Sequence, residues 1–382
     1  MYRLNTEQQA VVDRAGAIAE RGVAPHAQRV DREGAFPAES IAALGEDGFL
    51  GLTVPSELGG MGQGLRVASA VLDEVAQRCA STAMVYLMHL CGTACYAAAP
   101  ERTGAQLRAA AAGRHLSTLA WSERGSRSHF WAPVSRAVGR NGRVSISAEK
   151  SFVTSAGRAD GYVVSTQRPG AQQPTESTLY LVLRDDAGLG VAGGWSGLGM
   201  RGNASAPMTL TDVGVGEERA LCEPGKGFDA MLAILPVFQL GSAAVGVGIA
   251  EAAVGATQAH LTGSRNELLN ASLADLPEQR ARLARMRIAT DRARAHLVCS
   301  LDAVENPGPT TMLMVLASKA SASETALEVT DMGMRACGGA AFAGRVSVER
   351  NFRDARASVV MAPTTDQINE FVGRMLCGME LF

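Results

Sequence analysis

The stretch that decides the fold runs from Leu119 to Asp212 and carries three spaced motifs. The first reads Trp121-Ser122-Glu123-Arg124-Gly125-Ser126-Arg127-Ser128, and the second reads Glu149-Lys150-Ser151-Phe152-Val153-Thr154-Ser155-Ala156. The third reads Gly197-Leu198-Gly199-Met200-Arg201-Gly202. Short segments rich in β-branched and aromatic residues lie between Gly-rich turns in this stretch. Such a pattern predicts a β-domain.

The periodicity of apolar residues divides the chain into three parts. Residues 1–116 predict an N-terminal helical domain, residues 117–222 a middle β-domain, and residues 223–382 a C-terminal helical bundle. Within the middle part, Asn141-Gly142 between alternating apolar residues predicts a hairpin. Helices, then strands, then helices in one chain predict an α+β fold.

Individual helices follow from caps and period. We expect a helix that Thr6 caps and that starts at Glu7, a second from Phe36-Pro37 to Phe49, and a long Ala-rich helical region from Val67 to Ala99. Four further helices are expected in the C-terminal part, at Phe228–Leu261, Leu276–Glu305, Thr311–Cys337 and Thr365–Cys377.

Composition excludes several classes of function. The net charge of −2 gives no overall field for nucleic acid or an anionic membrane surface. The most apolar stretch, Leu232 to Ala250, contains Pro236 and Gln239, so we expect a buried helix and no membrane span. The seven scattered cysteines argue against a disulfide framework, and Cys91 and Cys95 lack the further ligands of a metal site. We therefore expect a cytoplasmic protein with no bound metal.

In their order and spacing, the three motifs resemble the middle β-domain of acyl-CoA dehydrogenases. Near the C-terminus, Cys337-Gly338-Gly339-Ala340-Ala341-Phe342 and Arg353-Asp354-Ala355 are similar to two further motifs of that family. The resemblance spans essentially the whole chain. It implies an N-terminal helical domain, a β-barrel-like middle domain and a C-terminal four-helix bundle, assembled as a homodimer or homotetramer. It also implies FAD as the cofactor.

The resemblance assigns residues to both ends of FAD. A bound isoalloxazine ring needs hydrogen-bond partners at N5 and at its carbonyl edge, and backbone amides and short hydroxyls in a turn suit this need. The residues expected at the flavin ring are Trp121, Ser122, Ser128, Phe152 and Thr154. Those expected at the rest of the cofactor are Arg265, Gly338, Gly339, Thr364 and Asp366. In the family, the Gly-Gly turn contacts FAD that is bound to a partner subunit.

Other positions depart from the family's motifs. In the first motif, Arg124 replaces a proline and Arg127 replaces a glycine. Ala362 occupies the position of the family's catalytic glutamate, and an alternative glutamate position falls on Phe238-Gln239. Dehydrogenation of an acyl thioester needs a carboxylate to take the α-proton while a hydride leaves the β-carbon for flavin N5. None of these three residues accepts a proton.

Three hypotheses remain open. The sequence favours an FAD-dependent oxidoreductase of fatty acid metabolism that acts on an acyl thioester of CoA or a carrier protein. An electron-transferring flavoprotein or O2 would be the acceptor, and the base would come from elsewhere. The second hypothesis is a flavin-dependent monooxygenase or oxidase of the same fold, and the third is a non-catalytic protein that binds an acyl thioester or FAD. The candidates for the base are His89, Glu251, Asp366 and Glu370.

Overall fold

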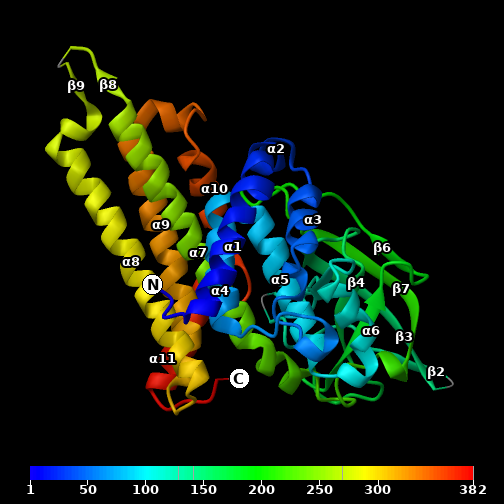
Figure 1. The fold of residues 1–382 in the computed structure, drawn as a ribbon. Helices are drawn as coiled ribbons and strands as arrows, with labels where there is room; N and C mark the ends of the chain where they lie inside the picture. The colour runs from blue at the N-terminus through cyan, green and yellow to red at the C-terminus, as the bar shows by residue number, and fades with distance from the viewer. Residues whose placement is uncertain (128, 141, 269, 382) are drawn as a thin grey trace.

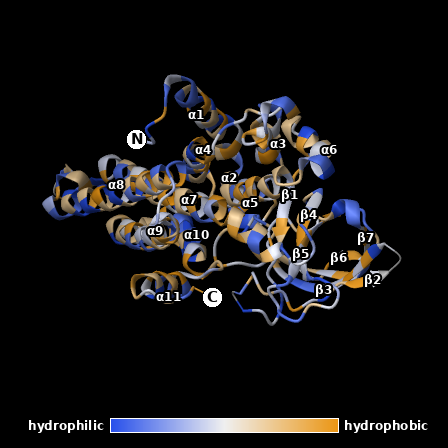
Figure 2. Ribbon diagram, turned by 90° about the horizontal axis from the view of Figure 1, so that it is seen from below, coloured by the Kyte–Doolittle hydropathy of each residue, from blue (hydrophilic) through white to orange (hydrophobic). Residues whose placement is uncertain are grey.

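The computed structural model describes residues 1–127, 129–140, 142–268 and 270–381. The strands from the middle of the chain lie at one end of the molecule, and the long C-terminal helices lie at the other (Figure 1). Figure 2 shows the same separation from below. This mixture of helices and segregated sheets confirms the predicted α+β class.

The N-terminal part is helical, as predicted. Its α-helices are α1 (Thr6–Ile18), α2 (Ala27–Glu33), α3 (Ala38–Glu46), α4 (Leu65–Arg78), α5 (Ala80–Ala97) and α6 (Pro100–Ala111). Short π or 3₁₀ segments join them at Ala19–Val23, Ala24–His26, Phe49–Gly51 and Ser56–Leu58.

Three details of the predicted N-terminal helices were wrong. Asn5, not Thr6, caps α1, because the Asn5 side chain accepts a hydrogen bond from the Gln8 amide and the Gln8 side chain accepts one from the Asn5 amide. The helical region that was expected to run unbroken to Ala99 is interrupted at Cys79, whose extended backbone separates α4 from α5. The second helix ends at Glu46, three residues before the predicted Phe49.

The middle part contains two sheets. The strands are β1 (Ser117–Ala120), β2 (Val138–Arg140), β3 (Arg143–Val153), β4 (Gly161–Gln167), β5 (Ser177–Leu183), β6 (Leu189–Val191) and β7 (Ala206–Gly216). One sheet has the order β1-β4-β5 and the other β2-β3-β7-β6. Isolated bridges, Glu123 to Lys150 and Arg136 to Gln167, connect the two sheets into a barrel-like domain. A separate hydrophobic core, which includes Ile146, Tyr162 and Val213, fills it.

A 3₁₀ turn at Glu217–Arg219 ends the middle part, and the C-terminal part consists mainly of long helices. These are α7 (Gly227–Gly263), α8 (Pro277–Glu305), α9 (Thr311–Phe342), α10 (Val348–Val360) and α11 (Thr365–Leu376). The connection from α7 to α8 contains a short hairpin and a 3₁₀ turn. The hairpin strands have two residues each, β8 (Arg265–Asn266) and β9 (Ala271–Ser272), and the turn spans Leu273–Asp275. Four of the five helices were predicted to within a few residues, whereas α10 was not.

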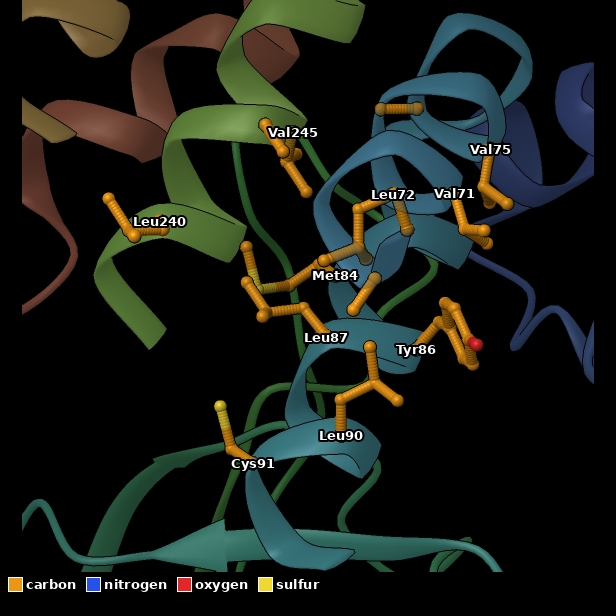
Figure 3. Packing of buried hydrophobic residues seen from close by; sticks show 14 of the residues in the cluster. Val71, Leu72, Val75, Met84, Tyr86, Leu87, Leu90, Cys91, Leu240 and Val245 are labelled. Carbon is orange, nitrogen blue, oxygen red and sulfur yellow. The ribbon is translucent and has the colours of Figure 1, made fainter. Parts of the chain in front are cut away.

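Helix α7 is the central element of the core. Figure 3 shows Val245 of α7 pointing toward Leu72 of α4 and Met84 of α5, whereas Leu240 points to the opposite side of α7. All four belong to one hydrophobic cluster. Helix α7 is long and apolar enough to cross a membrane, but 72% of its most apolar window is buried inside the protein. Burial in the core therefore explains its apolar composition, and the sequence predicted a buried helix for residues 232–250.

Candidate functional site

A pocket of about 610 Å³ lies where the β-domain meets helices α5, α7 and α10. The β-domain and its loops contribute Leu119, Trp121, Ser122, Glu123, Arg124, Gly125, Ser126, Arg127, Phe130, Ser151, Phe152, Thr154, Trp195, Met200, Asn203 and Ser205. The helices and the segment after α10 contribute Met84, Met88, Leu235, Phe238, Ala357, Val360, Met361 and Ala362. The pocket therefore joins the first two sequence motifs to the position of the missing glutamate.

The first motif lies where β1 ends, and a buried ion pair fixes it. The Lys150 ammonium donates to Glu123 Oε1 over 2.6 Å, and both side chains are almost completely buried. The second carboxylate oxygen of Glu123 accepts from the backbone amides of Val134 and Ser135. Burial raises the pKa of Glu123, but the charge of Lys150 and these hydrogen bonds outweigh it, so the pKa falls below its usual value. Glu123 thus stays ionised and holds the loop that follows β1.

The second motif turns Phe152 out of the sheet. The register between β3 and β7 shifts between Lys150 and Val153, and Phe152 has a φ of 55° there. The side chain of Phe152 is 71% exposed and meets Trp195 edge-on at 6.5 Å. A left-handed backbone and an uncovered ring both cost free energy, and such strain is concentrated at functional sites. The shift therefore presents an aromatic ring at the pocket in a way an ordinary strand would not.

The polar groups beside this ring suit a flavin. The indole N–H of Trp121 is buried and has no hydrogen-bond partner among the described residues, so a ligand's acceptor would satisfy it. The Trp121 ring stacks on Phe130 at 5.9 Å. The Thr154 hydroxyl lies 3.0 Å from the Ser205 hydroxyl and lines the pocket. Flat apolar faces with a few hydroxyls and N–H groups fit an isoalloxazine ring.

The helical wall of the pocket, as far as the structure describes it, carries no acid. Among the described lining residues, Glu123 is the one carboxylate, and it is tied to Lys150 and to the backbone. Phe238 and Ala362 both line the pocket, so the two positions of the expected base face the cavity without a proton acceptor. Gln239, beside Phe238, is completely buried, and both polar atoms of its amide lack a partner among the described residues.

The four candidate bases lie outside this pocket lining. His89 is buried, and its ring nitrogens bond the Leu50 carbonyl at 2.7 Å and the Ser117 amide at 3.1 Å. Glu251 forms ion pairs with Arg287 and Arg294. Asp366 is exposed on α11, and Glu370 is exposed with Arg374 at 3.8 Å. His89 and Glu251 are thus held by their partners inside the protein, and Asp366 and Glu370 lie on its surface.

Acidification from pH 6.5 to pH 4 is expected to lower the stability of the native protein by about 3 kcal/mol more than that of a His89→Gln variant. Burial lowers the pKa of folded His89 to about 4, so the unfolded chain binds a proton first as the pH falls. Asp354 acts in the opposite direction, because burial raises its pKa to about 6. Comparing the two proteins removes that contribution.

Urea unfolding at a series of pH values measures this effect. The slope of stability against pH should be steeper for the native protein, whatever the absolute stability of the variant. Equal slopes in the two proteins would contradict a neutral, buried His89.

Lys319 is a residue that sequence reasoning missed. Its buried ammonium donates to the carbonyl of Met361 over 2.7 Å and to that of Pro363 over 2.6 Å. These carbonyls flank Ala362, and the ammonium also lies 5.7 Å from the centre of the Phe238 ring. Burial lowers the pKa of Lys319 to about 7. A lone lysine within an apolar helical period, in a chain with three lysines, was the available signal.

The remaining predicted cofactor residues do not line this pocket within one chain. Arg265 lies in the β8–β9 hairpin, at the tip of the molecule away from the sheets (Figure 1). Gly338 breaks the helical backbone of α9, and a Cβ at Gly338 or Gly339 would meet nothing within 4 Å. Thr364 caps α11 through the Gln367 amide. Ser128 lies outside the described residues.

Comparisons with known proteins agree with this geometry. The acyl-CoA dehydrogenase N-terminal domain matches residues 5–112, the middle domain residues 118–213, and the C-terminal domain residues 225–376. The fold and the matches define an oxidoreductase of the acyl-CoA dehydrogenase type. The chain belongs to the acyl-CoA dehydrogenase family, which confirms the resemblance seen in its motifs.

Individual relatives cover nearly the whole chain. The probable acyl-CoA dehydrogenase FadE25 of Mycobacterium tuberculosis is 28% identical over 97% of this chain and 95% of its own. The butyryl-CoA dehydrogenase structure from Megasphaera elsdenii has a TM-score of 0.90 at 21% identity, over 98% of this chain and 99% of its own. A structure of KijD3 in complex with FMN and dTDP-3-amino-2,3,6-trideoxy-4-keto-3-methyl-D-glucose has a TM-score of 0.87 at 25% identity, over 99% of this chain and 95% of its own.

Proposed function

We propose that this protein is an FAD-dependent oxidoreductase that acts on an acyl thioester carried by CoA or a carrier protein. One observation carries the proposal. In a single pocket, the residues that suit a flavin ring face an apolar wall made by Met84, Met88, Leu235 and Val360. A flat cofactor on the first side would leave space for an apolar acyl chain on the second. The membership of the family supports this arrangement.

The chain's residues would orient the two ligands. Trp121 would donate its free N–H to the cofactor, and Thr154 would offer its hydroxyl. FAD, when bound, supplies a hydride acceptor at N5. Phe152 would cover one edge of the ring, and the apolar side chains of α5 and α7 would exclude water from the acyl chain.

The outer part of the cofactor would lie between two copies of the chain. Arg265, Gly338 and Gly339 are exposed or open and lie outside the pocket lining, which suits contact with FAD on a partner subunit. Phe342, which follows the Gly-Gly break, is 88% exposed, and an interface would cover it. We therefore propose a homodimer or homotetramer, with an electron-transferring flavoprotein or O2 as the electron acceptor.

An anaerobic titration of the yellow protein with acyl-CoAs of graded chain length tests the function. Bleaching of the oxidised flavin band is the expected result. A protein that binds flavin but that no thioester bleaches would contradict dehydrogenation. A protein that stays colourless after addition of FAD would contradict every flavin-dependent function and favour a binding-only role.

The second candidate is a flavin-dependent monooxygenase or oxidase of the same fold. The observation that favours it is the lack of a free carboxylate among the described residues of the pocket, since hydroxylation needs no base for an α-proton. The likeness to KijD3 shows that this fold also accompanies FMN and an amino sugar nucleotide in another protein. Oxygen consumption by the chemically reduced protein, stimulated by substrate in the absence of thioester bleaching, would distinguish this function.

Replacing Phe152 with glycine is expected to weaken flavin binding about tenfold while leaving the cofactor-free protein as stable or up to about 1 kcal/mol more stable. Glycine tolerates the φ of 55°, and the exposed ring contributes little to the core. Phe152→Ala is the matched control, because it loses the ring but keeps the strain. Flavin fluorescence titration and urea unfolding give the two quantities. An unchanged flavin affinity in both variants would remove Phe152 from the site.

A further inference from the structure

Two arginines lie in the pocket lining at positions where the family's motif has proline and glycine. Arg124 and Arg127 both belong to the turn after β1. The side chain of Arg124 is 84% exposed, and its ion-pair partner, Glu149, is 3.7 Å away and also exposed. Among the described residues, no acidic group lies within ion-pair distance of the Arg127 guanidinium. Neither arginine is therefore neutralised by a close, buried partner.

The charge of the pocket is consequently positive at this edge. Glu123 is the one acid among the described lining residues, and the buried ammonium of Lys150 neutralises it over 2.6 Å. The hydrogen bonds from Val134 and Ser135 occupy its other oxygen. Arg124 and Arg127 therefore add positive charge to the described lining, and the one acid paired with either of them there is the exposed Glu149 beside Arg124. An anion that enters beside them meets favourable electrostatics.

The backbone at Arg127 gives independent evidence. Arg127 has a φ of 41°, a conformation that glycine adopts freely and that a residue with a Cβ adopts at a cost. The chain keeps a long cationic side chain at this strained position. The Arg127 carbonyl accepts a hydrogen bond from the His129 amide, which stabilises the turn. A ligand contact would account for an arginine here better than a turn requirement does.

We propose that Arg124 and Arg127 bind a phosphate or diphosphate group of a ligand whose remaining part enters the apolar pocket. This inference rests on the proposed function for the identity of that ligand. Arginine suits the task, because its planar fork donates two parallel hydrogen bonds to phosphate oxygens. The phosphoryl group has two possible sources: the carrier of the acyl thioester, or the diphosphate of the flavin cofactor.

Isothermal titration calorimetry with the full-length protein tests the proposal and separates the sources. The variants are Arg124→Gln, Arg127→Gln and the double substitution, with Arg143→Gln, an exposed β3 arginine outside the pocket lining, as the matched control. Butyryl-CoA is compared with S-butyryl-N-acetylcysteamine, which carries the same acyl thioester without phosphate. FAD is compared with riboflavin on cofactor-free protein.

The double variant is expected to bind one phosphate-bearing ligand at least about tenfold more weakly than the native protein, with little change for its phosphate-free analogue. A selective loss of affinity for butyryl-CoA identifies the thioester carrier as the source of the phosphoryl group. A selective loss of affinity for FAD identifies the cofactor as that source. Equal losses for a ligand and its phosphate-free analogue, or no loss at all, would overturn the proposal. Calorimetry does not depend on flavin absorbance. A protein that binds no flavin would therefore disprove the proposed function, while the comparison of butyryl-CoA with its phosphate-free analogue would still test the phosphate site.

Discussion

Replacing Lys150 with methionine is expected to lower the free energy of unfolding by about 3–5 kcal/mol. The substitution leaves the Glu123 carboxylate buried without its counter-charge, although the Val134 and Ser135 amides still donate to it. The side chain of Glu123 is only 3% exposed, so water cannot replace the ammonium. Urea unfolding at pH 7 measures the change, and flavin affinity should fall with it because Glu123 holds the turn that lines the pocket.

The matched control is the double variant Glu123→Gln, Lys150→Met. It removes both charges and should recover most of the lost stability, because a buried pair is costly to break but far less costly to delete. A loss below about 1 kcal/mol in Lys150→Met would mean that the carboxylate finds other solvation. A double variant as unstable as the single one would show that lost packing, and not the unpaired charge, causes the effect.

Restoring an acid at position 362 has the second largest expected effect. Ala362→Glu is expected to speed anaerobic flavin bleaching by an acyl-CoA about 10²- to 10⁴-fold, the range for a positioned general base. Ala362 lines the pocket, and the Lys319 ammonium holds the carbonyls on both sides of it. A nearby ammonium favours the ionised carboxylate and so keeps the new group able to accept a proton.

Ala362→Gln is the control for this gain, since it has nearly the same shape and no basic oxygen at neutral pH. Stopped-flow absorbance of the flavin band gives both rates. Similar rates for the two variants would mean that the native protein has another base or that its reaction needs none. The first outcome would require a base from outside the described pocket lining, and the second would favour oxygen-dependent chemistry.

Short motifs were sufficient to find one side of the pocket. Trp121, Ser122, Phe152 and Thr154 were assigned from two motifs of eight residues each, and the structure brings all four to one cavity. A pattern of this kind works because the turn and the bulged strand are local structures. Their roles toward a flavin stay predictions.

Residues whose role depends on distant partners were harder to assign. His89 was a reasonable candidate by type, but its partners are Leu50 and Ser117, far away in the sequence. Glu251 likewise pairs with Arg294 of another helix. Two features of the helices were missed for a related reason. The Ala-rich period continues through Cys79, but tertiary packing breaks the helix there. Helix α10 owes most of its stability to tertiary packing, which a sequence pattern does not reveal.

The composition of the pocket lining also determines when, during synthesis of the chain, the site can form. Its lining extends from Met84 to Ala362, so its walls cannot meet until nearly the whole chain has left the ribosome. A nascent chain that still lacks α10 and the residues after it lacks the wall formed by Ala357, Val360, Met361 and Ala362, so loading of the proposed cofactor would follow synthesis. Because a ligand that binds only the finished fold stabilises it by mass action, cofactor supply would also control how many newly made copies escape proteolysis.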